Sequence, residues 1–270
     1  MNPPFGKNPI IYCSAHGNVI TQLAFEVNSI APSLIEKLCD LLPRLRFLKS
    51  LSIHTVYPLY KILPQVLDCL KTIKIEQLSF TLSSLAIIPP VLCKLKSLKF
   101  LQLTSNLLDE DSFPSEMKNL QKLQYLNLDS NSFSKIPPFI SKLNSLKSLS
   151  IGSKITKISP NSLPKSLTTL NLSGNKLTDI SGIAHLPRLK ELSLSYNNLS
   201  ELHPNITTNT TLETLKLMYN ELSELPADFG NLKQLKVLHL QENPLSKLPA
   251  SFWDLQHLEY LNLSLEASPP

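Results

Sequence analysis

One eleven-residue pattern, repeated at a fixed interval, constrains this chain more than any other feature of its sequence. The pattern has leucine at positions one, four, six and eleven and asparagine at position nine. It begins at Leu212 and again at Leu235, 23 residues later. A fixed period of about 20 to 29 residues with this pattern is typical of a solenoid in which every repeat supplies one strand to a parallel sheet. The sequence therefore predicts stacked, strand-bearing repeats.

The pattern can be followed along most of the 270 residues. We expect an N-terminal cap over residues 1–19, a repeat domain over 20–263 and a C-terminal tail over 264–270. A solenoid is a single domain whatever its length, because each repeat is supported only by its neighbours. About eleven repeats are predicted, the last incomplete, and their first residues are Ile20, Leu48, Ile75, Leu98, Leu123, Leu146, Leu167, Leu189, Leu212, Leu235 and Leu258.

Residues 20–263 resemble the leucine-rich repeat superfamily. The resemblance implies an α/β fold shaped as a curved horseshoe, with a parallel sheet on its concave face and helices and short turns on its convex face. The 23-residue repeats with Leu225-Pro226 and Leu248-Pro249 look like those of Ras-pathway scaffold proteins, whereas residues 182–189 look like the phosphatase-regulator type. Mixed repeat lengths and richness in Asn, Ser and Lys resemble translocated leucine-rich repeat effectors of intracellular bacteria.

The asparagines at motif position nine are expected to be structural. In this architecture they are buried, and each can exchange hydrogen bonds with backbone groups of the adjacent turn. An unpaired buried amide would cost about 1 to 3 kcal/mol. The motif places them at Asn28, Asn106, Asn131, Asn175, Asn197, Asn220 and Asn243.

Side chains between the leucines of a strand face the opposite way, so motif positions three, five, seven and eight should form the concave surface. In the first three repeats these residues are small and polar, whereas aromatic, Met and charged residues gather later, as in binding hot spots. Strand propensity alone also favours tyrosine, which is the alternative for any one of them. The candidate protein-binding residues are Phe100, Tyr125, Tyr196, Lys216, Met218, Tyr219, Val237, His239, Gln241, Glu242 and Tyr260.

Trp253 is the only tryptophan and occupies a position on the convex side. Two interpretations stay open. The ring packs against a C-terminal cap, or it belongs to a second contact surface.

The sequence contains no pattern that predicts catalysis or a cofactor. Cys13 and His16 are not followed by a second pair of metal ligands, and there is no Gly-rich phosphate loop. The net charge of +5 is spread as single lysines, which indicates a solvated face and no nucleic-acid site. We therefore expect no enzyme activity, no cofactor and no metal.

Membrane and export signals are not expected either. No apolar stretch reaches about 18 residues, and residues 1–15 lack the apolar run of a signal peptide. The four cysteines lack the paired clusters with which secreted leucine-rich repeat proteins cap their ends, so we interpret them as reduced thiols. These features favour a cytoplasmic monomer or, for a translocated effector, the host-cell cytosol.

The leading hypothesis is a non-enzymatic module whose concave face binds another protein and blocks its action. The resemblance to bacterial effectors implies that this partner is a host protein or a companion effector. The alternative is an adaptor that recruits substrates for a ubiquitin-ligase or phosphatase activity supplied by a missing region or a partner. Regulation of a phosphatase or GTPase rests on fold analogy alone.

Overall fold

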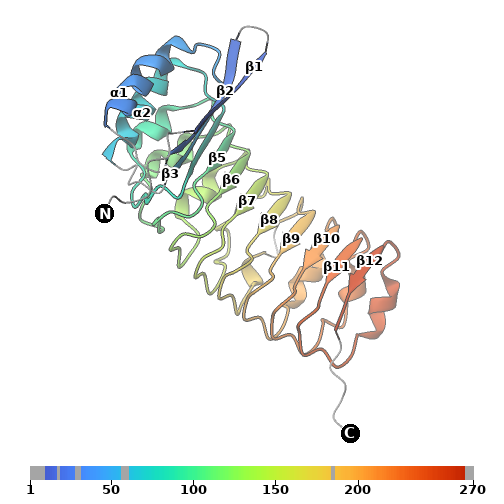
Figure 1. Cartoon of the computed structure of the whole chain (residues 1–270). Coiled ribbons are helices and arrows are strands. Elements are labelled where there is room, and N and C mark those ends of the chain that lie inside the picture. The colour runs from blue at the N-terminus through green and yellow to red at the C-terminus, as the bar shows by residue number, and fades with distance from the viewer. Residues whose placement is uncertain (1–9, 17–18, 28–31, 56–60, 184–185, 265–270) are drawn as a thin grey trace, which may run out of the picture. The chain divides into compact units, whose positions relative to one another are not determined.

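The computed structural model describes residues 10–16, 19–27, 32–55, 61–183 and 186–264. The chain divides into two compact units, residues 1–131 and 132–270. Within each unit the strands lie in the sheet in the order in which they occur in the sequence (Figure 1). This order is the one expected when every repeat supplies one strand.

The sheet of the first unit begins with an antiparallel pair, β1 (Ile10–His16) and β2 (Val19–Val27). The later strands are parallel, and the leucines at motif position four are register partners from strand to strand, as with Leu51 and Leu78. They are β3 (Ser50–Thr55), β4 (Gln77–Thr81), β5 (Phe100–Gln102) and β6 (Tyr125–Asn127).

Helices in the first unit shorten as the repeats shorten. The repeats that begin at Ile20 and Leu48 are 28 and 27 residues long and contain α1 (Pro32–Leu41) and α2 (Leu63–Cys69). These two helices pack against each other beside the sheet (Figure 1). The remaining helical turns are of the 3-10 type, namely η1 (Leu42–Arg44), η3 (Leu70–Thr72), η4 (Pro90–Lys94) and η5 (Ser115–Asn119).

The second unit is a regular stack of short repeats. Its parallel strands are β7 (Ser148–Ser150), β8 (Thr169–Asn171), β9 (Glu191–Ser193), β10 (Thr214–Lys216), β11 (Val237–His239) and β12 (Tyr260–Asn262). Repeats of 21 to 23 residues leave room for short turns, which are η6 (Pro138–Lys142), η7 (Ser181–Ile183), η8 (Pro204–Thr208), η9 (Phe229–Asn231) and η10 (Ala250–Asp254).

The motif leucines form the core, and the motif asparagines tie neighbouring repeats together. Asn220 is buried, and its Nδ2 donates to the carbonyl oxygens of Leu194 in the preceding repeat (3.0 Å) and Leu217 in its own (2.9 Å). Its Oδ1 accepts from the N–H of Leu199 (3.2 Å). The structural role predicted for these residues is confirmed, since the same bonds recur at Asn106, Asn131, Asn175, Asn197 and Asn243. Asn28 lies outside the described residues.

Within the described ranges, no helix has both the length and the apolar character needed to cross a lipid bilayer.

Candidate functional site

The outward side of the strands, which we call the sheet surface, carries the residues at motif positions three, five, seven and eight. None of the eleven predicted binding residues is buried, as the alternation of side chains along a strand requires. They divide between the units. Phe100 and Tyr125 lie on β5 and β6 of the first unit, and the other nine lie in the second unit on or just after β9 to β12.

Phe100 and Tyr125 are register partners on neighbouring strands, and their rings stack with centroids 4.2 Å apart and planes inclined by 3°. The side chain of Asn127 donates to the Tyr125 hydroxyl at 3.4 Å. Such a pair contributes about 0.5 to 1.5 kcal/mol beyond the area that it buries. The stack forms a flat, half-buried platform on the sheet surface of the first unit.

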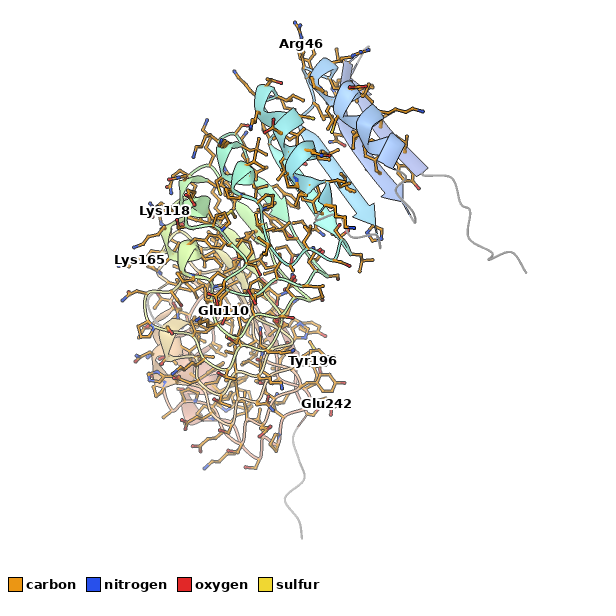
Figure 2. The ribbon with its side chains drawn as sticks, turned by 90° about the vertical axis from the view of Figure 1, so that its left-hand side faces the viewer. Arg46, Glu110, Lys118, Lys165, Tyr196 and Glu242 are labelled. Atoms are coloured by element: carbon orange, nitrogen blue, oxygen red, sulfur yellow. The ribbon has the colours of Figure 1, made fainter. Side chains whose placement is uncertain are left out.

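A second aromatic pair, Tyr196 and Tyr219, is more exposed. The rings stack at 4.6 Å with planes inclined by 13°, and the side chains remain 54% and 45% exposed. Both residues occupy motif position eight, as does Glu242 one repeat later. Figure 2 shows Tyr196 and Glu242 projecting from the same side of the second unit, with Lys165 on the opposite side.

The backbone at motif position eight is left-handed. Tyr196, Tyr219 and Glu242 have φ of 58°, 55° and 57°, and Gly174 occupies the equivalent place with φ of 69°. This conformation costs a residue with a side chain about 1 to 2 kcal/mol, and bulky residues are uncommon in it. Tyrosine is therefore placed at two successive positions where the backbone favours glycine. Ser105 and Ser130 take the same conformation at this position, with φ of 55° and 57°, so the turn belongs to the repeat and tyrosine is the unusual residue in it.

Next to the tyrosines the sheet surface contains polar atoms without partners. Within the described part of the chain, Ser195 Oγ, His239 Nδ1 and Gln241 Oε1 are buried and make no hydrogen bond. The amide nitrogen of Gln241 donates to the sulfur of Met218 at 3.7 Å. Each buried polar atom without a hydrogen bond costs roughly 1 to 3 kcal/mol of folding free energy.

His239 contacts Tyr260, with ring centroids 5.0 Å apart and planes inclined by 41°. Burial, with the positive charge of Lys216 as a smaller cause, lowers the pKa of His239 below its usual range. Both causes favour the neutral imidazole, in which one ring nitrogen accepts and the other donates.

Motif position two carries a charge ladder that was not predicted. The Glu213 carboxylate accepts from Lys190 Nζ at 2.8 Å and from Lys236 Nζ at 2.9 Å. These two lysine hydrogen bonds lower the pKa of Glu213 to about 2, and Glu213 in turn raises the pKa of Lys236. The first unit repeats the arrangement with Lys49, Glu76 and Lys99, at 3.2 and 2.7 Å. Lysine and glutamate alternate at motif position two from one of these repeats to the next, and this alternation in the sequence could have predicted the ladder.

Cys39 and Cys93 are poorly suited to act as nucleophiles. Burial raises the pKa of the Cys93 thiol to about 11, and burial together with the hydrogen bond that the Cys39 thiol makes to Cys69 raises the pKa of Cys39 to about 12. Both are therefore protonated at neutral pH, whereas the thiolate is the nucleophile. His54 pairs with the Thr81 hydroxyl at 2.7 Å. In the ranges that the structure covers, no three His, Cys, Asp or Glu residues gather as metal ligands would.

Trp253 lies on η10 and is 79% exposed. Its ring meets the edge of Phe252 at 5.6 Å, and Phe252 stacks on Phe229 at 6.2 Å. One side of the indole is therefore anchored by the core while most of the ring is free to contact another molecule. Residues 265–270 lie outside the described part, so a C-terminal cap over the ring and a second contact surface both stay predictions.

Comparison with known proteins gives consistent results. Three family models match separate segments: "Leucine rich repeat" over residues 210–265, "Leucine Rich repeats (2 copies)" over 165–206 and "Leucine Rich Repeat" over 122–143. No curated protein matches the sequence.

Several solved structures are similar to the chain. A leucine-rich repeat protein of Leptospira interrogans has 28% identity and a TM-score of 0.76, and the match covers 90% of this chain and 60% of that one. An internalin of Listeria monocytogenes has 22% identity and a TM-score of 0.61, over 83% of this chain and 69% of that one. A structure described as a TDR receptor has 30% identity and a TM-score of 0.60, over 74% of this chain and 36% of that one.

The chain thus spans three fifths of the length of the Leptospira protein. The motif, the stacked parallel strands, the asparagine bonds between repeats and these similarities show a leucine-rich repeat solenoid and support the assignment of this chain to the leucine-rich repeat superfamily.

Proposed function

We propose that this chain is a non-enzymatic, monomeric protein-binding module whose sheet surface covers part of another protein and inhibits it. The observation that carries the proposal is the pair of stacked, exposed tyrosines held in left-handed backbone at Tyr196 and Tyr219. A fold that needed only stability would gain from glycine or asparagine at these positions. Exposed tyrosines on a rigid scaffold are typical of binding hot spots.

The surroundings of the tyrosine pair support the same interpretation. Lys216 is exposed on β10, Met218 is half-buried beside the pair, and His239 Nδ1 and Gln241 Oε1 have no hydrogen-bond partner among the described residues. A partner that covers this area removes aromatic surface from water and can accept hydrogen bonds from the exposed Lys216. Both effects favour binding.

We further propose that the chain acts in the cytoplasm or, as a translocated bacterial effector, in the host-cell cytosol. The partner would be a host protein or a companion effector. Similarity to a protein of Leptospira interrogans over 90% of the chain supports a bacterial origin for this architecture. Mixed repeat lengths in one chain support it as well.

Capture of binding proteins from a cell lysate tests the proposal. Wild type is compared with a Tyr219→Ala, Lys216→Glu double variant, and bound proteins are identified by mass spectrometry. At least one protein should be retained by the wild type and lost from the variant. Circular dichroism and thermal unfolding confirm that the variant keeps its fold.

A matched variant, Lys165→Glu, reverses one exposed charge on the opposite side of the second unit (Figure 2). It should retain the partner as the wild type does. Equal capture by wild type and double variant would show that the sheet surface of the second unit is not the binding surface.

The second candidate is an adaptor whose repeats select a substrate for a ubiquitin ligase or a phosphatase. The exposed Trp253 on η10 favours it, because it offers a surface separate from the sheet surface. If the chain is such an adaptor, the Trp253→Ala variant should lose the ubiquitin ligase or phosphatase and still capture the substrate protein. Loss of one common partner in both the Trp253 and the Tyr219 variants would exclude the adaptor.

A further inference from the structure

The segments that follow β9, β10 and β11 form one border of the second unit, which we call the acidic edge. They are residues 196–201, 219–224 and 242–247. Each begins at motif position eight, so the stacked tyrosines stand at the start of the first two and Glu242 at the start of the third. The border is thus continuous with the sheet surface but distinct from it.

This edge is negative although the chain as a whole is positive. The three segments contain four exposed carboxylates, at Glu201, Glu221, Glu224 and Glu242, and one cation, at Lys247, whereas the whole chain has a net charge of +5. The Glu221 carboxylate is held in place, because it accepts from the side chain of Asn198 at 3.2 Å.

A groove runs beside these carboxylates. Its volume is about 560 Å³, and it crosses three successive repeats through equivalent Leu residues at Leu202, Leu225 and Leu248. Glu201 and Glu224 belong to its lining, together with Lys247. A shallow apolar channel with carboxylates along it suits an extended segment that carries cations.

Two unpartnered polar atoms belong to residues that directly precede the edge in the sequence. Ser195 is 4% exposed and directly precedes Tyr196, and its Oγ has no hydrogen-bond partner in the described part of the chain. Gln241 directly precedes Glu242, and its unpaired Oε1 can only accept. The exposed groups of the edge are mainly carboxylates, which accept hydrogen bonds, and aromatic faces.

We propose that the acidic edge docks an extended, arginine-bearing segment of the partner protein, which deepens and rests on the proposed protein-binding function. A guanidinium stacks on the exposed ring of Tyr196 or Tyr219 and donates to the neighbouring carboxylates. Arginine suits these groups better than lysine, because its planar fork donates in several directions while its face stacks on an aromatic ring.

Selection from a phage-displayed library of random dodecapeptides tests this inference. The purified chain is the bait, and the enriched peptides are then synthesised and titrated by fluorescence polarisation. The enriched sequences should contain arginine well above its frequency in the library. Affinity should fall about tenfold or more in each of two double variants. Tyr196→Ser with Tyr219→Ser removes the cation–π contact, and Glu221→Gln with Glu224→Gln removes two charge-assisted hydrogen bonds.

Two matched controls separate the edge from general charge and aromatic effects. The first control is a double variant, Asp111→Asn with Glu116→Gln, which removes two exposed carboxylates from the first unit. The second control, Tyr12→Ser, removes an exposed tyrosine from β1. Both should bind the peptides within about twofold of the wild type.

Selection without arginine enrichment, or peptides that bind the edge variants as tightly as the wild type, would overturn the inference. Peptides lost in Lys216→Glu but retained by the Glu221→Gln, Glu224→Gln variant would place binding on the sheet surface alone. That result would overturn the acidic edge while leaving the proposed function standing.

Discussion

At the scale of single residues, the asparagines of motif position nine carry the bonds between repeats. Asn220→Ala removes two donated bonds and one accepted bond and leaves the backbone groups of Leu194 and Leu199 without them. We expect a loss of about 2 to 4 kcal/mol in the free energy of unfolding, measured by urea denaturation. Asn198→Ala is the control, because that exposed side chain bonds to Glu221, and it should change stability by less than about 0.5 kcal/mol. Similar losses in the two variants would contradict a structural role for Asn220.

The charge ladder makes stability depend on pH through Glu213. Its pKa is lowered to about 2 in the folded chain from an ordinary value of 4.5, so the unfolded chain binds the proton more tightly. The contribution of this carboxylate is fully present above about pH 4.5 and is lost as the pH falls towards 2. The difference in unfolding free energy between wild type and Glu213→Gln should therefore narrow steadily over this interval.

Salt provides the control for that experiment, because about 1 M sodium chloride screens exposed charges. At pH 7 it should reduce the difference in unfolding free energy between wild type and Glu213→Gln. A difference that stays constant with both pH and salt would mean that the substitution acts through packing and not through charge.

At the scale of elements, the 3-10 turns on the back of the second unit stack closely through glycine. The N–H of Gly230 on η9 donates to Ser251 Oγ on η10 at 3.1 Å, and a methyl group on Gly230 would overlap the Ser251 carbonyl. Gly230→Ala should therefore destabilise the fold by about 1 to 3 kcal/mol in urea unfolding. Gly174→Ala, which meets no atom but requires φ of 69°, should cost about 1 kcal/mol. A Gly230→Ala variant as stable as the wild type would show that η9 and η10 are free to separate.

Much of this element-level arrangement follows from the sequence, because each motif position has one environment in every repeat. Leucine at position four must be buried in every strand, and asparagine at position nine must find the same backbone groups, so both were predictable. Spacing alone does not predict which side chains meet across strands. The stacking of Tyr196 on Tyr219 and the reach of Lys190 and Lys236 to Glu213 depend on rotamers, which the motif leaves open. The left-handed backbone at position eight was indicated only by Gly174.

At the scale of the whole molecule, each repeat is stabilised mainly by its immediate neighbours. The chain divides into two compact units, and the ladder of asparagine bonds connects successive repeats within each. Stability in such stacks is approximately a sum of repeat and nearest-neighbour contributions. Damage in one repeat should therefore spread to adjacent repeats and weaken with distance along the stack.

Hydrogen exchange measured by mass spectrometry tests this locality with two matched core substitutions. Leu101 on β5 and Leu215 on β10 are register-equivalent leucines, fully buried in different units, and either change to alanine should cost about 2 to 5 kcal/mol. Leu215→Ala should lower amide protection over residues 189–262 more than over 75–131, and Leu101→Ala should do the reverse. Equal loss of protection in both ranges for both variants would mean that the chain opens as one cooperative body, and the nearest-neighbour account would then be wrong.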